Sequence, residues 1–256
     1  LLERAGRHVI LTSAGEQLLG YARRMIALND EAVTRLTEPS FEGELVLGVP
    51  HDIVYPHIPS VLKRFSAEFP RVKVNLLSSY TTALKAQFEE GSCDIILATE
   101  DTRPEGAEVL ATLPLVWVGA PGGTAWRARP LRLAFERNCM FRPLSQAALD
   151  RVDIPWELAV ESDSSRSIAA TVSADLAVHV AIAGTTDVHF EEICHGDTLP
   201  DLSSAHINLY VRDLPDVKRA PGQARLAEML RGAYLSRPLQ RSAAPGQSVT
   251  AAALAS

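Results

Sequence analysis

The sequence of 256 residues contains no hydrophobic run that approaches the roughly 18 consecutive apolar residues of a membrane-spanning helix. Its first ten residues, LLERAGRHVI, do not form a secretory signal peptide, because arginines interrupt the apolar positions. The cysteines, Cys93, Cys139 and Cys194, are odd in number and widely spaced, which argues against a disulfide framework and favours a reducing compartment. We therefore expect a cytoplasmic protein that has no membrane partner.

The sequence also lacks an excess of positive charge, because its formal net charge is −6. Any contact with nucleic acid must therefore come from a local basic patch rather than from the whole surface. The composition is otherwise that of an ordinary globular protein, with 46% hydrophobic and 22% charged residues. Its length suits one large domain or two modest ones.

Signatures of catalysis are missing as well. The sequence has no G-x-S-x-G, no H-E-x-x-H and no phosphate-loop motif. His189, Glu191, Cys194 and His195 lie close together in HFEEICH, but the P-C-x-x-C partner of the zinc deaminase motif is absent. We therefore predict no catalytic residue, no metal site and no cofactor.

Residues 72–99, VKVNLLSSYTTALKAQFEEGSCDIILAT, predict a strand, a helix and a strand. The first strand alternates apolar and polar residues, and the last is an unbroken apolar run typical of a parallel strand covered on both faces. Hydroxyl side chains that can cap the helix crowd its start: Ser78, Ser79, Thr81 and Thr82. A parallel sheet places its ligand crevice at such helix N-termini, so we predict a small-molecule pocket at Thr81 and Thr82.

A similar unit precedes this one. Glu44–Val49 is predicted to be a buried strand, followed by a helix from about Ile53 to Phe69. Together the two units give β-α-β-α-β, which is half of a doubly wound sheet. Asp52 caps or flanks the first helix at the carboxyl edge of this sheet, so it should face the same crevice as Thr81. A plain helix cap is an equally good interpretation of Asp52.

The remainder of the chain continues to alternate predicted strands and helices. The strands are expected at 131–135, 154–160 and 206–213, and the helices at 144–151 and 223–235. The segment SDSSRS, residues 162–167, is a second hydroxyl-rich helix start. Ser164 and Ser165 are therefore candidates for ligand contact from a second lobe, with helix capping as the alternative of equal weight.

The N-terminal residues 1–12 are typical of a short hairpin that carries Arg4 and Arg7. These arginines are candidates for contacts with DNA phosphates or with the minor groove. On this segment alone, two solvated arginines are the better interpretation. A long helix is predicted to follow over residues 13–37, with either Thr12 or Ser13 as its cap.

That helix carries apolar residues spaced alternately by four and three, together with one asparagine, and they form a heptad seam: Leu18, Ala22, Met25, Asn29, Ala32 and Leu36. Such a stripe on a helix that precedes a separate domain should pair with a second chain. Asn29 would weaken this pairing but fix its register. The alternative, which we favour less, is a helix that folds onto its own domain.

The pattern T-x-x-L-x-x-x-F-x-x-G-x-x-D, from Thr81 to Asp94, resembles the effector-binding domain of LysR-type transcriptional regulators. LLERAGRHVILTSAGEQLLGYARRMIALNDEA resembles the wing of their winged helix-turn-helix and the linker helix that follows it. IPWELA is similar to the branch of the family associated with motility and virulence control. The resemblance implies an α/β, two-lobe, periplasmic-binding-protein-like effector domain preceded by a winged-helix remnant and a long linker helix.

The resemblance also implies domain boundaries. The segments are a wing remnant at 1–12, a linker and dimerisation helix at 13–37, a first lobe at 43–114 and 214–236, and a second lobe at 115–213. The composition of 237–256, which is low in bulky apolar residues, predicts a disordered tail. In the family the DNA-reading helix lies upstream of the wing. The residues present would therefore assist DNA binding without conferring sequence specificity, and we expect them to be part of a longer chain.

Two features depart from the family pattern. Residues 174–178 read ADLAV where family members commonly have A-G-L-G-V, so a ligand contact by the backbone of that turn is not carried over. Asp52 places a carboxylate near the predicted pocket. Many effectors of the family are small carboxylates, and Asp52 would repel one unless an arginine or lysine compensates.

We therefore predict a transcription regulator that binds double-stranded DNA as a homodimer or homotetramer. Its effector-binding domain would sense a small metabolite, which is not identified by the sequence, and would change the subunit geometry on the promoter. A solute-binding protein of a transporter shares the architecture, but the heptad helix and the unpaired cysteines speak against it. An enzyme on the same fold is a third hypothesis, weakened by the lack of a catalytic residue set.

Overall fold

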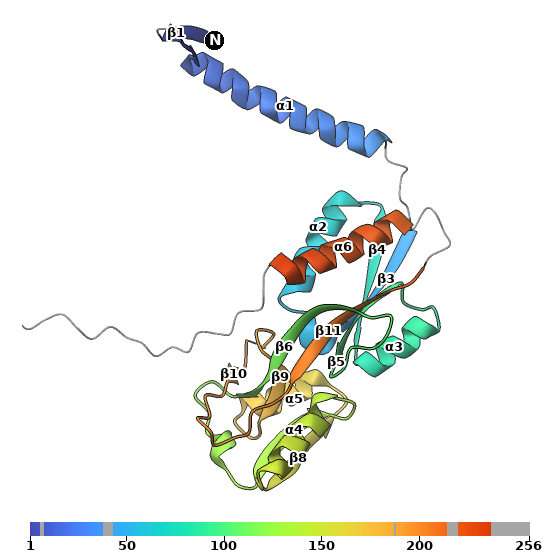
Figure 1. The fold of residues 1–256 in the computed structure, drawn as a ribbon, viewed down its shortest axis with the longest axis vertical. Helices are drawn as coiled ribbons and strands as arrows, with labels where there is room; N and C mark the ends of the chain where they lie inside the picture. The colour runs from blue at the N-terminus through green and yellow to red at the C-terminus, as the bar shows by residue number, and fades with distance from the viewer. Residues whose placement is uncertain (6–7, 38–42, 187, 214–219, 237–256) are drawn as a thin grey trace, which may run out of the picture.

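The fold is described here from a computed structural model for residues 1–5, 8–37, 43–186, 188–213 and 220–236. Strands β1 (Leu2–Ala5) and β2 (His8–Leu11) form an antiparallel hairpin, and helix α1 (Ser13–Thr37) follows it (Figure 1). The hairpin and the long helix were both predicted from the sequence. Thr12 is the cap, because its Oγ1 accepts a hydrogen bond from the backbone N–H of Gly15 at 3.1 Å.

The first lobe is built on three parallel strands. Strand β3 (Gly43–Pro50) lies between β4 (Val72–Ser79) and β5 (Ile95–Glu100) and is parallel to both. The helices α2 (His57–Glu68) and α3 (Thr81–Glu89) connect these strands. This arrangement confirms the predicted half of a doubly wound sheet, and it places the carboxyl ends of the three strands at one edge.

The starts of these helices differ from the prediction. The residues after β3 form a short 3-10 helix, η1 (His51–Ile53), and α2 begins only at His57 with Pro56 as its N-cap residue. Because the residue before a proline is disfavoured in helical geometry, Tyr55 cannot continue the helix, and Asp52 does not cap α2. Helix α3 has Tyr80 as its N-cap residue, without a side-chain cap, so none of the predicted serines and threonines caps it.

Two long strands complete the sheet of the first lobe. Strand β11 (Ser204–Val211) pairs antiparallel with β5 on one side and with the first half of β6 (Glu108–Gly119) on the other. From the sequence, β11 was placed in the second lobe within 115–213. Its hydrogen bonds assign it to the first lobe, because the chain returns through the sheet before α6 (Ala220–Ser236) packs against α2 (Figure 1).

The second lobe uses the other half of β6. That half pairs with β9 (His179–Ile182) and β10 (Glu191–Glu192), while β7 (Leu131–Glu136) and β8 (Trp156–Ser162) form a parallel pair. The helices α4 (Phe141–Arg151) and α5 (Ser165–Ser173) and the short η2 (Ala125–Arg127) belong to this lobe. Strand β6 therefore passes from one sheet into the other.

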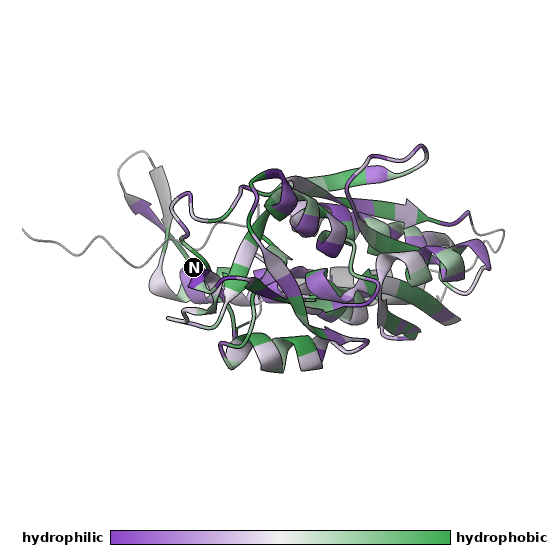
Figure 2. Cartoon of the chain, turned by 90° about the horizontal axis from the view of Figure 1, so that it is seen from below, coloured by the Kyte–Doolittle hydropathy of each residue, from purple (hydrophilic) through white to green (hydrophobic). Residues whose placement is uncertain are grey.

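The core is formed by apolar side chains of the sheets and of the helix faces turned toward them, and Figure 2 shows both hydrophobic and hydrophilic residues along the helices. Phe65 on α2 is fully buried and stacks on Phe69, with their ring centroids 4.9 Å apart. Gly48 on β3 lies under α3, where a Cβ would come within 2.9 Å of Leu84. Within the described residues, no helix is long and apolar enough to span a membrane.

Asp94 joins three elements of the first lobe. Its Oδ2 accepts a hydrogen bond from the backbone N–H of Val46 on β3 at 2.8 Å. Its backbone carbonyl accepts one from Nε2 of Gln223 on α6 at 3.0 Å. Asp94, which ends the motif noted in the sequence, therefore ties the start of β5 to the neighbouring strand and to the last helix.

Candidate functional site

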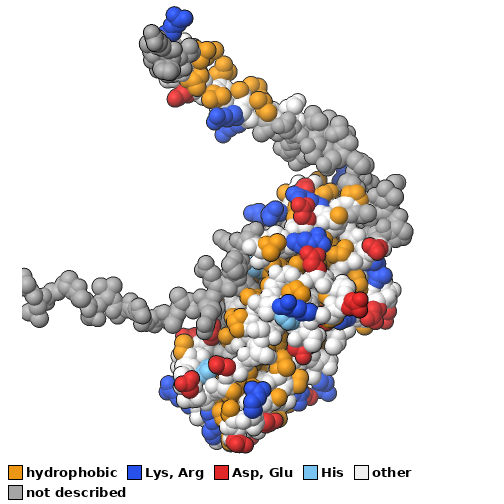
Figure 3. Space-filling view, viewed as in Figure 1, with side chains coloured by type: hydrophobic (Ala, Val, Ile, Leu, Met, Phe, Trp, Pro, Cys, Tyr) orange, Lys and Arg blue, Asp and Glu red, His pale blue; other side chains and the backbone are white. Residues whose placement is uncertain are grey.

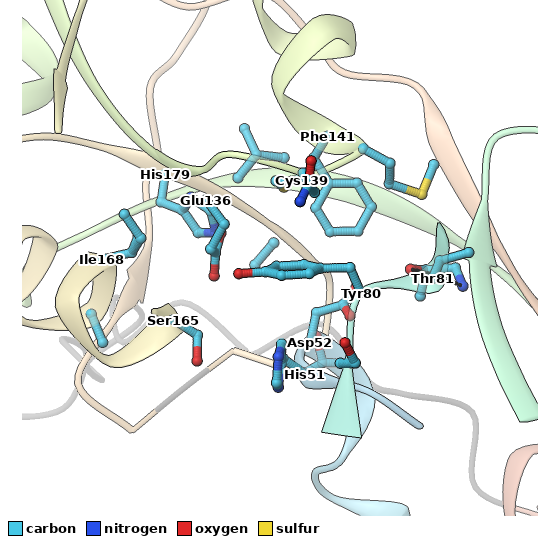
Figure 4. A pocket seen from close by; sticks show the side chains of 18 of the residues that line it. His51, Asp52, Tyr80, Thr81, Glu136, Cys139, Phe141, Ser165, Ile168 and His179 are labelled. Carbon is cyan, nitrogen blue, oxygen red and sulfur yellow. Dashed lines mark hydrogen bonds between the residues drawn. The ribbon is translucent and has the colours of Figure 1, made fainter. Parts of the chain in front are cut away.

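A cavity of about 1120 Å³ lies between the two lobes. The carboxyl edge of the parallel strands lines it from the first lobe, and the end of β7 and the start of α5 line it from the second. Figure 4 shows the residues at its centre: His51, Asp52, Tyr80, Thr81, Glu136, Cys139, Phe141, Ser165, Ile168 and His179. A volume of this size accommodates a small organic ligand.

Thr81 and Thr82, at the start of α3, both line this cavity. The Thr81 hydroxyl accepts a hydrogen bond from the backbone N–H of Thr99 at 3.0 Å, and it lies 3.1 Å from the Thr99 hydroxyl. It therefore holds the start of α3 against the end of β5. Thr82 is exposed and makes no hydrogen bond with another described side chain.

Asp52 lines the cavity from η1, at the carboxyl end of β3, where it was expected to meet Thr81. Burial raises its pKa to about 6, and the negative charge of Glu136 raises it further, whereas hydrogen bonds from its own backbone N–H and from the Thr99 side chain oppose the rise. Its Oδ2 atom is buried and has no hydrogen-bond partner among the described residues.

This raised pKa makes a prediction for stability. A carboxyl group that binds its proton more tightly in the folded state contributes stability below its unfolded pKa, near 3.8, and the contribution is lost as the pH rises through about 6. Asp52→Asn cannot ionise and therefore does not lose this contribution. We expect the difference in free energy of unfolding between Asp52→Asn and the wild type to shift by about 1–3 kcal/mol in favour of the variant as the pH rises from about 4 to about 7. Urea unfolding of both proteins at both pH values measures this difference, and parallel pH profiles would contradict it.

The two serines predicted from the second lobe are placed differently. Ser165, the first residue of α5, lines the cavity. Ser164 is the exposed N-cap residue of α5, without a side-chain cap, and it is not among the lining residues. Its backbone N–H donates to Oγ of Ser162 at 3.1 Å, so its local role is in the turn before the helix.

Residues that the sequence did not single out complete the centre of the cavity. Glu136, the last residue of β7, is only 9% exposed, and its carboxylate makes no hydrogen bond or ion pair within the described chain. His179 at the start of β9 donates from Nδ1 to the carbonyl of Ala134 at 2.8 Å, and burial lowers its pKa. The Tyr80 hydroxyl donates to the carbonyl of Asp163 at 2.7 Å, which joins the two lobes.

The lysine at this edge is already paired. Nζ of Lys85 lies 2.7 Å from Oε1 of Glu100, and the other carboxylate oxygen, Oε2, accepts hydrogen bonds from Nδ2 of Asn208 and from the Tyr210 hydroxyl. Burial opposes the ionisation of Glu100, but the hydrogen bonds from Asn208, Lys85 and Tyr210 together hold its pKa below the ordinary value. Lys85 therefore neutralises Glu100 rather than Asp52.

Asp175 occupies the position of the first glycine in the A-G-L-G-V pattern noted in the sequence. It adopts a positive φ of 56°, a conformation that Asp tolerates better than most residues. Its carboxylate accepts hydrogen bonds from the backbone N–H groups of Thr124 and Ala125, which hold its pKa below the ordinary value. Gly123 leaves room for this contact, because a Cβ there would meet the carboxylate.

The structure describes the side chains of four of the six residues in the predicted seam on α1. Leu18 and Met25 are 48% and 61% exposed, Asn29 is exposed and Ala22 is half-buried, and Figure 3 shows hydrophobic side chains along α1. The side chains of Ala32 and Leu36 lie outside the described part of the chain. Arg4 is exposed on β1, whereas Arg7 and the predicted tail at 237–256 also lie outside the described residues.

The segment HFEEICH does not gather metal ligands in space. No group of three or more His, Cys, Asp or Glu residues that could hold a metal ion occurs in the part of the chain that the structure describes. The three cysteines are free, and burial raises the pKa of Cys139 in the cavity to about 12.

Comparison with known proteins identifies a family model and a relative that are similar to this chain in sequence. The family model of the LysR substrate binding domain matches residues 39–194. The regulator PecT of Dickeya dadantii (strain 3937), described as an HTH-type transcriptional regulator, is 26% identical over 186 residues, which is 70% of this chain. The chain spans 57% of the length of PecT.

Two solved structures share the fold. The crystal structure of CbnR, a LysR family transcriptional regulator, is 19% identical and covers 90% of this chain and 84% of its own, with a TM-score of 0.53. The effector-binding domain of QuiR in complex with shikimate is 12% identical and covers 76% of this chain and 97% of its own, with a TM-score of 0.56.

Proposed function

We propose that this chain, which belongs to the LysR family, is part of a transcription regulator that senses a small metabolite. The observation that carries the proposal is the cavity between the lobes, lined by Asp52 and Thr81 from one lobe and by Ser165 from the other. A ligand that contacts both lobes binds most tightly when they are closed around it. It therefore shifts the population toward one arrangement of the subunits.

The regulator would act as a homodimer or homotetramer on double-stranded DNA in the cytoplasm. The exposed seam on α1 supports pairing of two chains, because Leu18 and Met25 leave an apolar stripe that no described element covers. The hairpin at 1–12 would assist DNA binding through Arg4 and Arg7, as the wing does in the family. We propose no catalytic role for the chain.

The protonated thiol of Cys139 in the cavity argues against a function as a peroxide sensor. Peroxide oxidises thiolates, and the raised pKa of Cys139, which results mainly from burial, keeps this thiol protonated at neutral pH. A reversible small-molecule effector accounts better for the polar groups around it.

The proposal is tested by filling the cavity. Ala169 on α5 lines the cavity, whereas Ala170 on the same helix is exposed and does not. We expect every metabolite that raises the melting temperature of the wild type to lose this effect in Ala169→Trp, because the indole occupies the ligand's space, and to keep it in Ala170→Trp. Thermal-shift screening of the three proteins measures this effect. Hits that stabilise Ala169→Trp as well as the wild type would show that ligands bind elsewhere.

A further inference from the structure

The centre of the cavity is acidic on both sides. Asp52 enters it from the first lobe and Glu136 from the second, and Figure 4 shows both carboxylates directed toward the space around Tyr80. Five Asp or Glu residues line the cavity, but only two Lys or Arg residues, together with three histidines: Asp52, Glu89, Glu100, Asp101 and Glu136, against Lys85 and Arg166, with His51, His179 and His189. An anionic ligand placed at this centre would meet two carboxylates.

Neither central carboxylate is neutralised by a described side chain. Glu136 is 9% exposed, and its carboxylate has no ion pair or hydrogen bond within the described residues. Oδ2 of Asp52 is buried and has no partner. The charge of Glu136 acts on Asp52, and two buried carboxylates that repel each other are unfavourable unless a positive group or a proton compensates them.

Lys85, His179 and Arg166 line the cavity, but none of them pairs with Asp52 or Glu136 within the described residues. Lys85 is held by Glu100 at 2.7 Å. His179 directs its Nδ1–H to a backbone carbonyl, and burial lowers its pKa, which disfavours the charged ring. Arg166, the second residue of α5, lines the cavity with an exposed side chain, and it makes no ion pair with Asp52 or Glu136 within the described residues. Within the described residues, these three side chains therefore leave the carboxylates of Asp52 and Glu136 without an ion pair.

Aromatic rings also line the cavity. The ring of Tyr80 packs edge-on against His51, with their centroids 5.4 Å apart, and Phe141 and Phe190 also line the cavity. Aromatic faces attract ammonium groups and tolerate their methylene neighbours. A divalent metal ion fits less well, because no cluster of three ligating residues occurs in the described chain.

We propose that the effector carries an aliphatic amine or ammonium group, which is held between the carboxylates of Asp52 and Glu136 and against the ring of Tyr80. This inference rests on the proposed function, because it names the chemical class of the ligand of the same cavity. The ammonium joins the two lobes by contacting one carboxylate from each. It thereby favours their closed arrangement.

The test uses calorimetry on the whole chain with matched four-carbon probes: 1,4-diaminobutane and butyltrimethylammonium as cations, 1,4-butanediol as the neutral analogue and succinate as the anion. We expect at least one cation to bind, and the diol and succinate to bind about tenfold more weakly or not at all. Asp52→Asn and Glu136→Gln should each weaken the binding of the cation by about tenfold or more. Glu157→Gln, which removes an exposed carboxylate of β8 outside the cavity, should not change it.

The outcomes separate this inference from the proposed function. The proposal of an amine effector would be wrong if neither cation bound, or if cation binding were unchanged in both Asp52→Asn and Glu136→Gln. If succinate bound instead and Ala169→Trp abolished its binding, the ligand-sensing cavity would stand and only its ligand class would be wrong. If binding of MgCl₂ displaced the cation, a metal rather than an amine would be the partner of the two carboxylates.

Discussion

Replacing Phe65 by alanine is expected to lower the free energy of unfolding by about 3–5 kcal/mol. The Phe65 side chain is fully buried on α2, stacks on Phe69 and lies within 4.0 Å of where a Cβ on Gly222 of α6 would be. Alanine would remove an entire ring from a packed site and leave a cavity that two helices and the sheet cannot close.

Urea unfolding followed by circular dichroism measures this loss. Phe65→Leu keeps most of the volume and should cost less than half as much. Lys63→Ala, an exposed substitution on the same helix, should change the stability by no more than about 0.5 kcal/mol. If Phe65→Ala unfolded at the same urea concentration as Lys63→Ala, the packing of α2 against the sheet would have to be different.

The second large effect is expected at the seam of α1. In the double variant Leu18→Asp and Met25→Asp, two charges enter the apolar stripe that we propose to pair two chains. Charges at such positions are desolvated in a coiled coil without a partner, so we expect the dissociation constant of the dimer to rise about 100-fold or more. Sedimentation equilibrium measures this constant.

The seam offers a control with the same net charge. Gln17→Asp and Gly20→Asp also add two carboxylates to α1, but both positions are exposed on the outer side of the heptad, and a Cβ on Gly20 would contact nothing within 4 Å. This variant should dimerise like the wild type. A seam variant that dimerised as tightly as its control would assign the dimer interface to another part of the chain.

The first-lobe half of the cavity was predictable because it depends on local rules. Parallel strands joined by helices bring their carboxyl ends to one edge, so Asp52 and Thr81 had to lie near each other. The same rule applies to Glu136, which follows the predicted strand at 131–135, and would have singled it out. The second-lobe candidates depend instead on the hydroxyl-rich segment 162–167, and hydroxyl content gives no signal at Glu136.

Other features depend on contacts between distant segments. The pairing of β11 with β5 joins residues more than 100 positions apart, for example His206 with Glu100, and no periodicity in β11 indicates which sheet it enters. The partner of Asp175 is likewise set by a loop about 50 residues earlier. The capping of α3 was predicted from serine and threonine content, whereas the Thr81 hydroxyl is used by the backbone of Thr99 instead.

Strand β6 has a consequence for how the lobes can move. Its residues 108–114 pair with β11 in one sheet, and residues 115–119 pair with β9 and β10 in the other. The two lobes are therefore connected by a continuous hydrogen-bonded strand rather than by a flexible linker. Any opening of the space between the lobes must twist this strand. We therefore expect small rotations of the lobes that the strand opposes elastically, and not unrestricted hinge motion.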